Sequence, residues 1–142
     1  MRKKVMLAED DQDDQMFFKE AIGEISNEIQ LQIKNNGEEL MTTLINDHGP
    51  VPDIIFIDLN MPIKDGFSCL KEIKVSEKLK NCTVVILTTS NNKDHMDLAY
   101  KLGATLYVCK PNNFKDLKSV LNEIFLRDFT VSNLTGKMNY QA

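Results

Sequence analysis

The sequence has few cysteines, no excess of basic residues and no long apolar run, and each shortage argues against a class of protein. Its formal net charge is −4, whereas proteins that bind nucleic-acid backbones cluster lysine and arginine on one surface. We therefore expect no direct DNA binding. The apolar stretch after the basic start is short and is interrupted by Glu9 and Asp10, which argues against a signal peptide or a membrane span. We expect a cytoplasmic protein with no membrane partner.

The three cysteines are Cys69, Cys82 and Cys109. An odd number of widely spaced cysteines with apolar neighbours fits neither a disulfide framework nor a zinc site. We interpret them as reduced thiols that pack as small apolar side chains.

The length of 142 residues allows one compact domain, because domains usually hold about 100–200 residues. We assign residues 1–127 to this domain and residues 128–142 to a C-terminal tail, which leaves no room for a second, effector-sized domain. The tail is polar and has no clear period. It is either a frayed end or, because Phe129, Val131 and Leu134 lie at or near alternate positions, an arm that packs on a partner or a second copy.

Short apolar runs of strand length recur along the chain. They are residues 5–8, 29–33, 54–57, 83–87 and 105–109. The third and fourth runs are continuously hydrophobic, which is typical of central parallel strands covered by helices on both faces. The second run alternates apolar and polar residues, so we place it nearer an edge of the sheet.

Segments with helical periodicity lie between these runs and after the last one. Their apolar positions are Phe17, Ala21 and Ile25; Leu40, Leu44 and Ile45; Phe67, Leu70 and Ile73; Met96, Ala99 and Leu102; and Leu117, Val120, Leu121, Ile124 and Phe125. Asn113, with Asp116 three residues later, predicts a helix start, and Gly103 predicts a helix end in the left-handed conformation. Strands that alternate with helices in this way predict an α/β fold with a doubly wound, five-stranded parallel sheet.

Polar and charged residues stand at the ends of four predicted strands. Glu9 and Asp10 follow the first strand, Asp58 the third, Thr88 the fourth and Lys110 the fifth. In doubly wound sheets the functional crevice lies beyond the carboxyl ends of the strands, so we expect these side chains at one edge. Carboxylates that converge from neighbouring strands repel one another unless a cation shares the site. The pattern therefore predicts a bound divalent ion.

Magnesium fits this donor set best, because Mg²⁺ prefers oxygen ligands, keeps several waters and needs only one or two carboxylates. We expect Asp10 and Asp58 as direct ligands, with Glu9 bound directly or through water. The backbone carbonyl of Asn60 is a further candidate, because the Met-Pro pair that follows turns the chain just past the strand.

The same residues suggest phosphoryl chemistry. A carboxylate such as Asp58 can attack phosphorus and form an aspartyl phosphate. Transfer builds charge on the phosphoryl oxygens, and positioned cations and donors stabilise that charge. The Lys110 ammonium can hold one oxygen, and either the Thr88 hydroxyl or a backbone N–H after Asp58 can donate to another.

Together these motifs resemble the receiver domain of response regulators, over roughly residues 3–127. The matching motifs are Glu9-Asp10, Asp58-Leu59-Asn60-Met61-Pro62 with Asp65-Gly66, Thr88, and Lys110-Pro111. The resemblance implies a flavodoxin-like (βα)5 fold with strand order 2-1-3-4-5 and a function in two-component signal transduction. It also implies that Asp58 is the phosphoacceptor, that Glu9 and Asp10 hold magnesium, and that Thr88 and Lys110 bind the phosphoryl group.

Two further expectations come from the family. Tyr107 matches its aromatic switch position, where burial of the ring is coupled to movement of Thr88; the alternative for Tyr107 is an ordinary strand aromatic. The bond between Lys110 and Pro111 is expected to be cis, an isomer found in a small minority of X–Pro bonds.

The resemblance implies a sensor histidine kinase as phosphodonor and a downstream protein or phosphotransfer protein as target. The acidic run at residues 9–14 and the pair Thr88-Thr89 further resemble single-domain receivers that serve bacterial phytochrome-type kinases. Such a protein is not an enzyme in the usual sense: it catalyses only its own phosphorylation and dephosphorylation, and phosphorylation switches a protein–protein interaction surface. Formation of a homodimer is left open.

Three other functions are alternatives. A degenerate receiver that acts as a constitutive interaction module would tolerate loss of the site residues. A haloacid-dehalogenase-type phosphatase needs a second acid two residues after its nucleophile, where this chain has Asn60. A flavin-binding domain needs a phosphate loop after the first strand, where the acidic residues 9–11 would repel a phosphate.

Several polar residues have a plain structural interpretation. Asp13 and Asp14 are expected as solvated residues of a helix start, where carboxylates interact favourably with the helix dipole. For Asp11 two alternatives remain: a solvated helix-start residue or a member of the functional site. His48 and His95 have no partner pattern and are expected at the surface.

Overall fold

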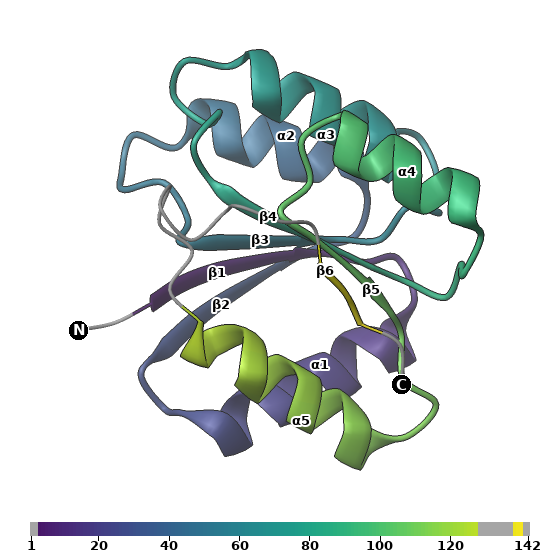
Figure 1. Ribbon diagram of the computed structural model, residues 1–142. Coiled ribbons are helices and arrows are strands. Elements are labelled where there is room, and N and C mark those ends of the chain that lie inside the picture. The colour runs from purple at the N-terminus through teal and green to yellow at the C-terminus, as the bar shows by residue number, and fades with distance from the viewer. Residues whose placement is uncertain (1–2, 128–137, 141–142) are drawn as a thin grey trace.

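The computed structural model describes residues 3–127 and 138–140, which form a parallel sheet with helices on both faces (Figure 1). In chain order the elements are β1 (Lys3–Ala8), α1 (Gln12–Ile25), β2 (Ile29–Lys34), α2 (Gly37–Asn46), β3 (Ile54–Ile57), α3 (Gly66–Val75), β4 (Thr83–Thr88), α4 (Lys93–Lys101), β5 (Leu106–Cys109), α5 (Phe114–Leu126) and β6 (Met138–Tyr140). Among the described residues, no helix combines the length and the hydrophobicity that crossing a bilayer requires.

The strands lie in the order β2-β1-β3-β4-β5-β6, and every neighbouring pair is parallel. The predicted order 2-1-3-4-5 is therefore confirmed. The sixth strand was not predicted: residues 138–140 pair with residues 106–108 of β5. Pairing of this kind uses backbone groups at an open sheet edge, so a polar sequence does not prevent it. Residues 128–137, on which the predicted tail and arm depend, lie outside the described residues.

The sheet has a core on each face, because successive strand residues point to opposite sides. Met6, Ile55 and Ile86 belong to the core under α2, α3 and α4, whereas Leu7 and Phe56 belong to the core under α1 and α5 (Figure 1). All four residues of β3 are buried, while β2 alternates between less and more exposed positions at the sheet edge. Both observations confirm the positions expected from the hydrophobic patterns.

Each helix of the described chain begins after an aspartate or asparagine. The side chain of this residue accepts a hydrogen bond from a backbone N–H of the first turn, which satisfies a donor that has no partner inside the helix. These N-caps are Asp11, Asn36, Asp65, Asn92 and Asn113. The helix start predicted at Asn113 is confirmed, and Gly103, with φ of 109°, ends α4 in the left-handed conformation as expected.

The apolar faces of two helices differ from the sequence expectation. Phe17 and Ile45 are 47% and 57% exposed, whereas Phe18 is only 2% exposed. In α1 the buried residues are Phe18, Ala21 and Ile22, which share one face of the helix at i, i+3 and i+4. Phe17 is consequently turned away from the core and lies beside the cleft described below.

The cysteines lie as the sequence predicted. All three are free thiols, with Cys69 and Cys82 buried and Cys109 half-buried. Burial raises the pKa of the Cys69 thiol to about 12, because a thiolate loses solvation in an apolar environment. Cys69 therefore remains a neutral thiol at physiological pH.

Gly66 allows α3 to begin against the end of β3. A Cβ atom built on Gly66 would lie 2.5 Å from the backbone oxygen of Asp58 and 2.9 Å from the Cα atom of Leu59. Its N–H donates to the backbone oxygen of Leu59 at 3.0 Å. Neither of the backbone atoms that a Cβ would meet can move without shifting Asp58, so only glycine fits at this position.

We predict that Gly66→Ala lowers the free energy of unfolding by about 1–3 kcal/mol, because the new methyl group must push the backbone at Asp58. Gly23→Ala is the matched control: its Cβ would meet nothing within 4 Å, and the substitution should stabilise α1 by up to about 1 kcal/mol. Urea unfolding of both variants checks the pair. Equal stability of Gly66→Ala and the wild type would contradict the close approach.

Candidate functional site

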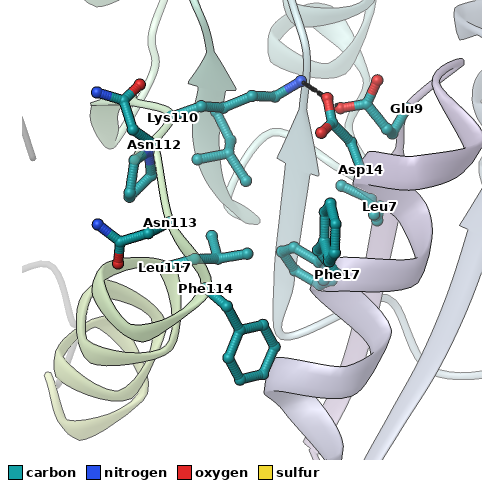
Figure 2. Close-up of a pocket in the computed structure, with 12 residues that line it drawn as sticks. Leu7, Glu9, Asp14, Phe17, Lys110, Asn112, Asn113, Phe114 and Leu117 are labelled. Atoms are coloured by element: carbon teal, nitrogen blue, oxygen red, sulfur yellow. Dashed lines mark hydrogen bonds and ion pairs between the residues drawn. The ribbon is translucent and has the colours of Figure 1, made fainter.

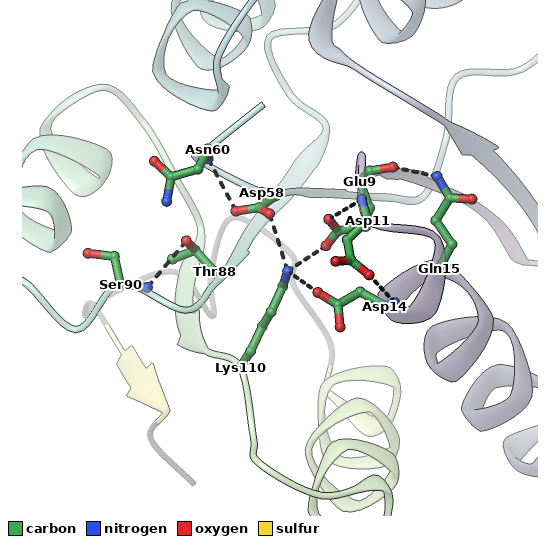
Figure 3. A network of polar contacts seen from close by, with 9 residues as sticks. All are labelled: Glu9, Asp11, Asp14, Gln15, Asp58, Asn60, Thr88, Ser90 and Lys110. Atoms are coloured by element: carbon green, nitrogen blue, oxygen red, sulfur yellow. Dashed lines mark hydrogen bonds and ion pairs between the residues drawn. The ribbon is translucent and has the colours of Figure 1, made fainter. Parts of the chain in front are cut away.

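Four of the predicted site residues, Glu9, Asp58, Thr88 and Lys110, meet at one edge of the sheet (Figure 3). Strands β1, β3, β4 and β5 are neighbours, so the residues at their carboxyl ends are brought together. Glu9, Asp58 and Thr88 are 2%, 6% and 0% exposed, and they are the buried polar or charged residues of the described chain. Buried groups of this kind need partners.

Lys110 supplies the main partner. Its Nζ atom lies 2.5 Å from Glu9 Oε1, 2.9 Å from Asp14 Oδ2 and 3.2 Å from Asp58 Oδ2. Figure 3 shows the side chain pointing from the end of β5 into the middle of these carboxylates. Burial alone would lower the pKa of Lys110, but the hydrogen bonds to Glu9 and Asp14 outweigh it and raise the pKa. Lys110 is therefore an ammonium in this structure.

Glu9 is held firmly and is incompletely neutralised. Its Oε2 atom accepts the backbone N–H of Asp11 at 3.1 Å, and its backbone oxygen accepts the side-chain amide of Gln15 at 2.6 Å. Burial nevertheless raises the pKa of Glu9 to about 7, although Lys110 opposes the shift. The contact with Lys110 therefore does not fully offset the cost of burying this carboxylate.

The acidic cluster fits a divalent cation. Carboxylate oxygens of Glu9, Asp10 and Asp58 all lie within 4.8 Å of one another. Oxygen donors and excess negative charge suit a hard cation such as Mg²⁺, Mn²⁺ or Ca²⁺. These three side chains would hold the ion. The backbone N–H of Asn60 donates to Asp58 Oδ1 at 3.2 Å, and the backbone carbonyl of Asn60 stays a predicted ligand.

Thr88 and Tyr107 are linked through the loop after β4. The Thr88 Oγ1 atom accepts the backbone N–H of Ser90 at 3.4 Å, and the Tyr107 hydroxyl donates to the backbone oxygen of Ser90 at 2.8 Å. The Tyr107 ring is 0% exposed, and burial raises its pKa. Tyr107 is thus buried and anchored to the residue that also contacts Thr88.

The predicted cis bond before Pro111 is wrong. The described residues contain no cis peptide bond, so the Lys110–Pro111 bond is trans. Trans is the more stable isomer of X–Pro bonds by about 0.5–1 kcal/mol, and Lys110 reaches its three carboxylates from this arrangement.

The sequence interpretation missed two contributors to the site. Asp14, expected as a solvated residue, contacts Lys110. His95, expected at the surface, is half-buried and its Nδ1 atom lies 2.8 Å from the hydroxyl of Ser90. No spacing rule identifies these contacts, although the position of Asp14 one turn into the helix after Asp10 is a weak signal that it faces the same edge.

A cleft of about 180 Å³ lies beside the acidic cluster, between α1 and the start of α5. Phe17, Phe114 and Leu117 form much of its apolar wall, and Lys110 and Asn112 lie on its polar side (Figure 2). Phe17 and its neighbour on α1 are large apolar side chains that remain substantially exposed. An exposed apolar area of this kind next to charged groups is typical of a contact site for another molecule.

A family model for the response regulator receiver domain matches residues 5–122. The chain is a response regulator receiver. Domains of this family are phosphoacceptor switches of two-component systems and interact with histidine kinases and downstream proteins.

The receiver is similar to several characterised relatives. Response regulator Rcp1 of Synechocystis is 35% identical over 126 residues, which cover 86% of each chain. Among solved structures, the phosphorylated cyanobacterial phytochrome response regulator RcpA has a TM-score of 0.82 and 33% identity, covering 87% of the receiver and 91% of RcpA. The Mn²⁺-bound form of Rcp1 has a TM-score of 0.81 and 34% identity, covering 90% and 97%. The fold and family predictions are therefore confirmed.

We predict that Lys110→Met destabilises the receiver in chelator by up to about 3–5 kcal/mol, because it leaves buried carboxylates without their ammonium. Mg²⁺ or Mn²⁺ should then raise the unfolding temperature of Lys110→Met more than that of the wild type, since a cation can replace the lost charge.

Lys118→Met is the control, because the ion pair between Lys118 and Glu24 is largely exposed, with 41% and 53% of the side chains accessible. Its stability should change by less than about 0.5 kcal/mol. Thermal unfolding with and without metal compares the variants. An equal metal response in Lys110→Met and Lys118→Met would contradict the role of the ammonium.

Proposed function

We propose that the receiver accepts a phosphoryl group from a sensor histidine kinase on Asp58, in a reaction that needs a divalent ion, and that phosphorylation switches a protein–protein interaction surface. One observation carries the proposal: the Lys110 ammonium contacts both Glu9 and Asp58 where the carboxylates cluster. A degenerate receiver would have no need to keep this buried, charged arrangement.

In the proposed reaction, a carboxylate oxygen of Asp58 forms a bond to phosphorus while the bond from phosphorus to the imidazole nitrogen of the kinase histidine breaks. Asp58 is already oriented, because its Oδ1 atom accepts the N–H of Asn60 and its Oδ2 atom faces Lys110. Lys110 then donates to a phosphoryl oxygen, and the hydroxyl of the buried Thr88 donates to another. Hydrolysis of the acyl phosphate returns the carboxylate, so the receiver acts only on itself.

We propose Mg²⁺ as the resident ion, held by Glu9, Asp10 and Asp58 with the backbone carbonyl of Asn60 as the further candidate. When bound, it would neutralise charge on the carboxylates and on the transferred phosphoryl group. Support comes from the carboxylate cluster and from the relative Rcp1, whose solved structure is described as Mn²⁺-bound. Mg²⁺ is preferred because it accepts few protein carboxylates together with phosphate oxygens.

We also propose that Thr88 and Tyr107 form the switch. Both contact Ser90 in the loop between β4 and α4, so a shift of Thr88 toward a phosphoryl group acts on the partner of the Tyr107 hydroxyl. The interaction surface that responds is the one around α4 and β5, where Tyr107 lies.

The proposed phosphodonor is a phytochrome-type histidine kinase of the cytoplasm. RcpA is described as a cyanobacterial phytochrome response regulator, and another similar structure, with a TM-score of 0.80 and 26% identity, is described as acting in red light signalling of R. palustris. The cleft beside Phe17 and the exposed Met16, which is 56% accessible, supply an apolar contact for a protein donor next to Asp58.

We predict that acetyl phosphate with Mg²⁺ adds one phosphoryl group to the wild type, because a small donor needs only the site itself. The modification should map to the peptide that contains Asp58, should be labile at alkaline pH, and should be absent in Asp58→Asn and in the presence of chelator. Intact-protein and peptide mass spectrometry measure it. Asp13→Asn removes an exposed carboxylate that lies outside the cluster and should label normally; labelling of Asp58→Asn would refute the assignment.

A second prediction concerns the donor. Phe17→Ser should slow phosphoryl transfer from an autophosphorylated phytochrome-type kinase at least several-fold while labelling by acetyl phosphate is unchanged, because only the protein donor needs the apolar contact. Leu126→Ser is the control, since Leu126 is 79% exposed at the other end of α5. Equal transfer rates for both variants would exclude this contact surface, and no transfer to the wild type would exclude the kinase class.

A further inference from the structure

Ser90 is the meeting point of contacts from three parts of the molecule. Its N–H donates to Thr88 Oγ1 at 3.4 Å, and its backbone oxygen accepts the Tyr107 hydroxyl at 2.8 Å. Its own hydroxyl lies 2.8 Å from Nδ1 of His95, a residue of α4. Figure 3 shows Ser90 next to Thr88 at the edge of the phosphoacceptor site. The loop residue that links Thr88 to Tyr107 is therefore itself tied to α4.

The other contacts of Ser90 and His95 are compatible with a hydrogen bond from the Ser90 hydroxyl to the imidazole. The Ser90 Oγ atom accepts the backbone N–H of Asn92 at 3.3 Å, which leaves its hydrogen available for donation. In the His95 tautomer protonated at Nε2, Nδ1 is the acceptor of that hydrogen. The imidazole ring also packs edge-on against Phe67 of α3, with ring centroids 5.7 Å apart and an interplanar angle of 67°. This packing fixes the ring in the position that Ser90 needs.

We propose that His95 and Ser90 are positioning residues of the switch: the imidazole accepts the Ser90 hydroxyl and thereby holds the loop where its backbone oxygen can receive Tyr107. The proposal rests on the switch role of Thr88 and Tyr107 proposed above. It names the groups that set the equilibrium between the buried and the exposed Tyr107 ring in the unphosphorylated receiver.

The buried Tyr107 hydroxyl needs an acceptor, because an unpaired polar group costs free energy in the core. Its acceptor is a loop carbonyl, and loops move unless side-chain contacts hold them. The hydroxyl of Ser90 and the ring of His95 provide such contacts. Loss of either contact leaves the backbone oxygen of Ser90 less well placed to accept the Tyr107 hydroxyl. The buried state of the Tyr107 ring is then less stable relative to the exposed state.

The held loop is also ready for a phosphoryl group. Thr88 uses Oγ1 to accept the Ser90 N–H, which leaves its own hydrogen available for donation toward Asp58. A phosphoryl group that favours this position of the loop binds more favourably when the loop already occupies that position. The contact between His95 and Ser90 therefore biases the unphosphorylated receiver toward the state with Tyr107 buried.

The experiment follows the Tyr107 ring in unphosphorylated protein by ¹⁹F NMR of 3-fluorotyrosine. The chain has three tyrosines, and Tyr107→Phe identifies the resonance of interest. Ser90→Ala removes the donor, and His95→Phe removes the acceptor while keeping an aromatic ring beside Phe67. Each should raise the population of the solvent-exposed Tyr107 state about 2- to 10-fold, the value of one hydrogen bond. The double variant should shift the population no further than either single variant.

Three controls separate the hydrogen bond from general disturbance. Ser90→Thr keeps the hydroxyl and should behave as wild type, and His48→Phe makes the same change at the other histidine, which is exposed. Circular dichroism of the same samples establishes that each variant is folded, and Ser90→Ala alone decides the matter if His95→Phe does not fold.

Unchanged Tyr107 populations in Ser90→Ala, or effects that multiply in the double variant, would overturn the proposal. Because these measurements need no phosphodonor, they are independent of whether acetyl phosphate labels Asp58. Failure of the labelling with an intact effect on Tyr107 would remove the phosphoacceptor assignment and leave the loop contact standing.

Discussion

The ammonium of Lys110 is the interaction on which the site depends. The ends of two strands, β1 and β3, bring the carboxylates of Glu9, Asp10 and Asp58 together, and in a poorly solvated environment such charges repel one another strongly. Lys110 contacts Glu9, Asp14 and Asp58 at once, yet the pKa of Glu9 remains raised, at about 7. The resting cluster thus gathers three carboxylates around one ammonium, and this excess of negative charge favours a further cation.

The fold and the site have a common origin in the parallel sheet. Continuous apolar runs such as β3 can be buried on both faces only between two layers of helices, and the resulting connections place every strand end at one edge. The close approach of Gly66 then fixes the backbone at Asp58 against α3. The residues that make the core and the residues that make the site are therefore neighbours in the chain. A substitution that shifts a core strand also shifts the site residue at its end.

Much of this arrangement could be predicted from the sequence, because strand ends are identified by where apolar runs stop. The convergence of Glu9, Asp58 and Lys110 follows directly from the strand order. The contacts of Asp14 and His95 could not be predicted, since which face of a helix turns toward a loop depends on how the helix packs. The strand at residues 138–140 was missed for a related reason: edge pairing uses the backbone, and a short polar segment carries no hydrophobic pattern.

The N-caps of the helices have a consequence for the field at the site. In the described part of the chain each helix follows a strand and runs back across the sheet, so the five helix starts lie at the same edge of the sheet as the strand ends. A helix start carries about half a positive charge. The starts capped by Asp11, Asp65 and Asn92 follow the strand-end residues Glu9, Asp58 and Thr88 in the chain. The backbone N–H groups of these helix starts thus offset part of the carboxylate repulsion.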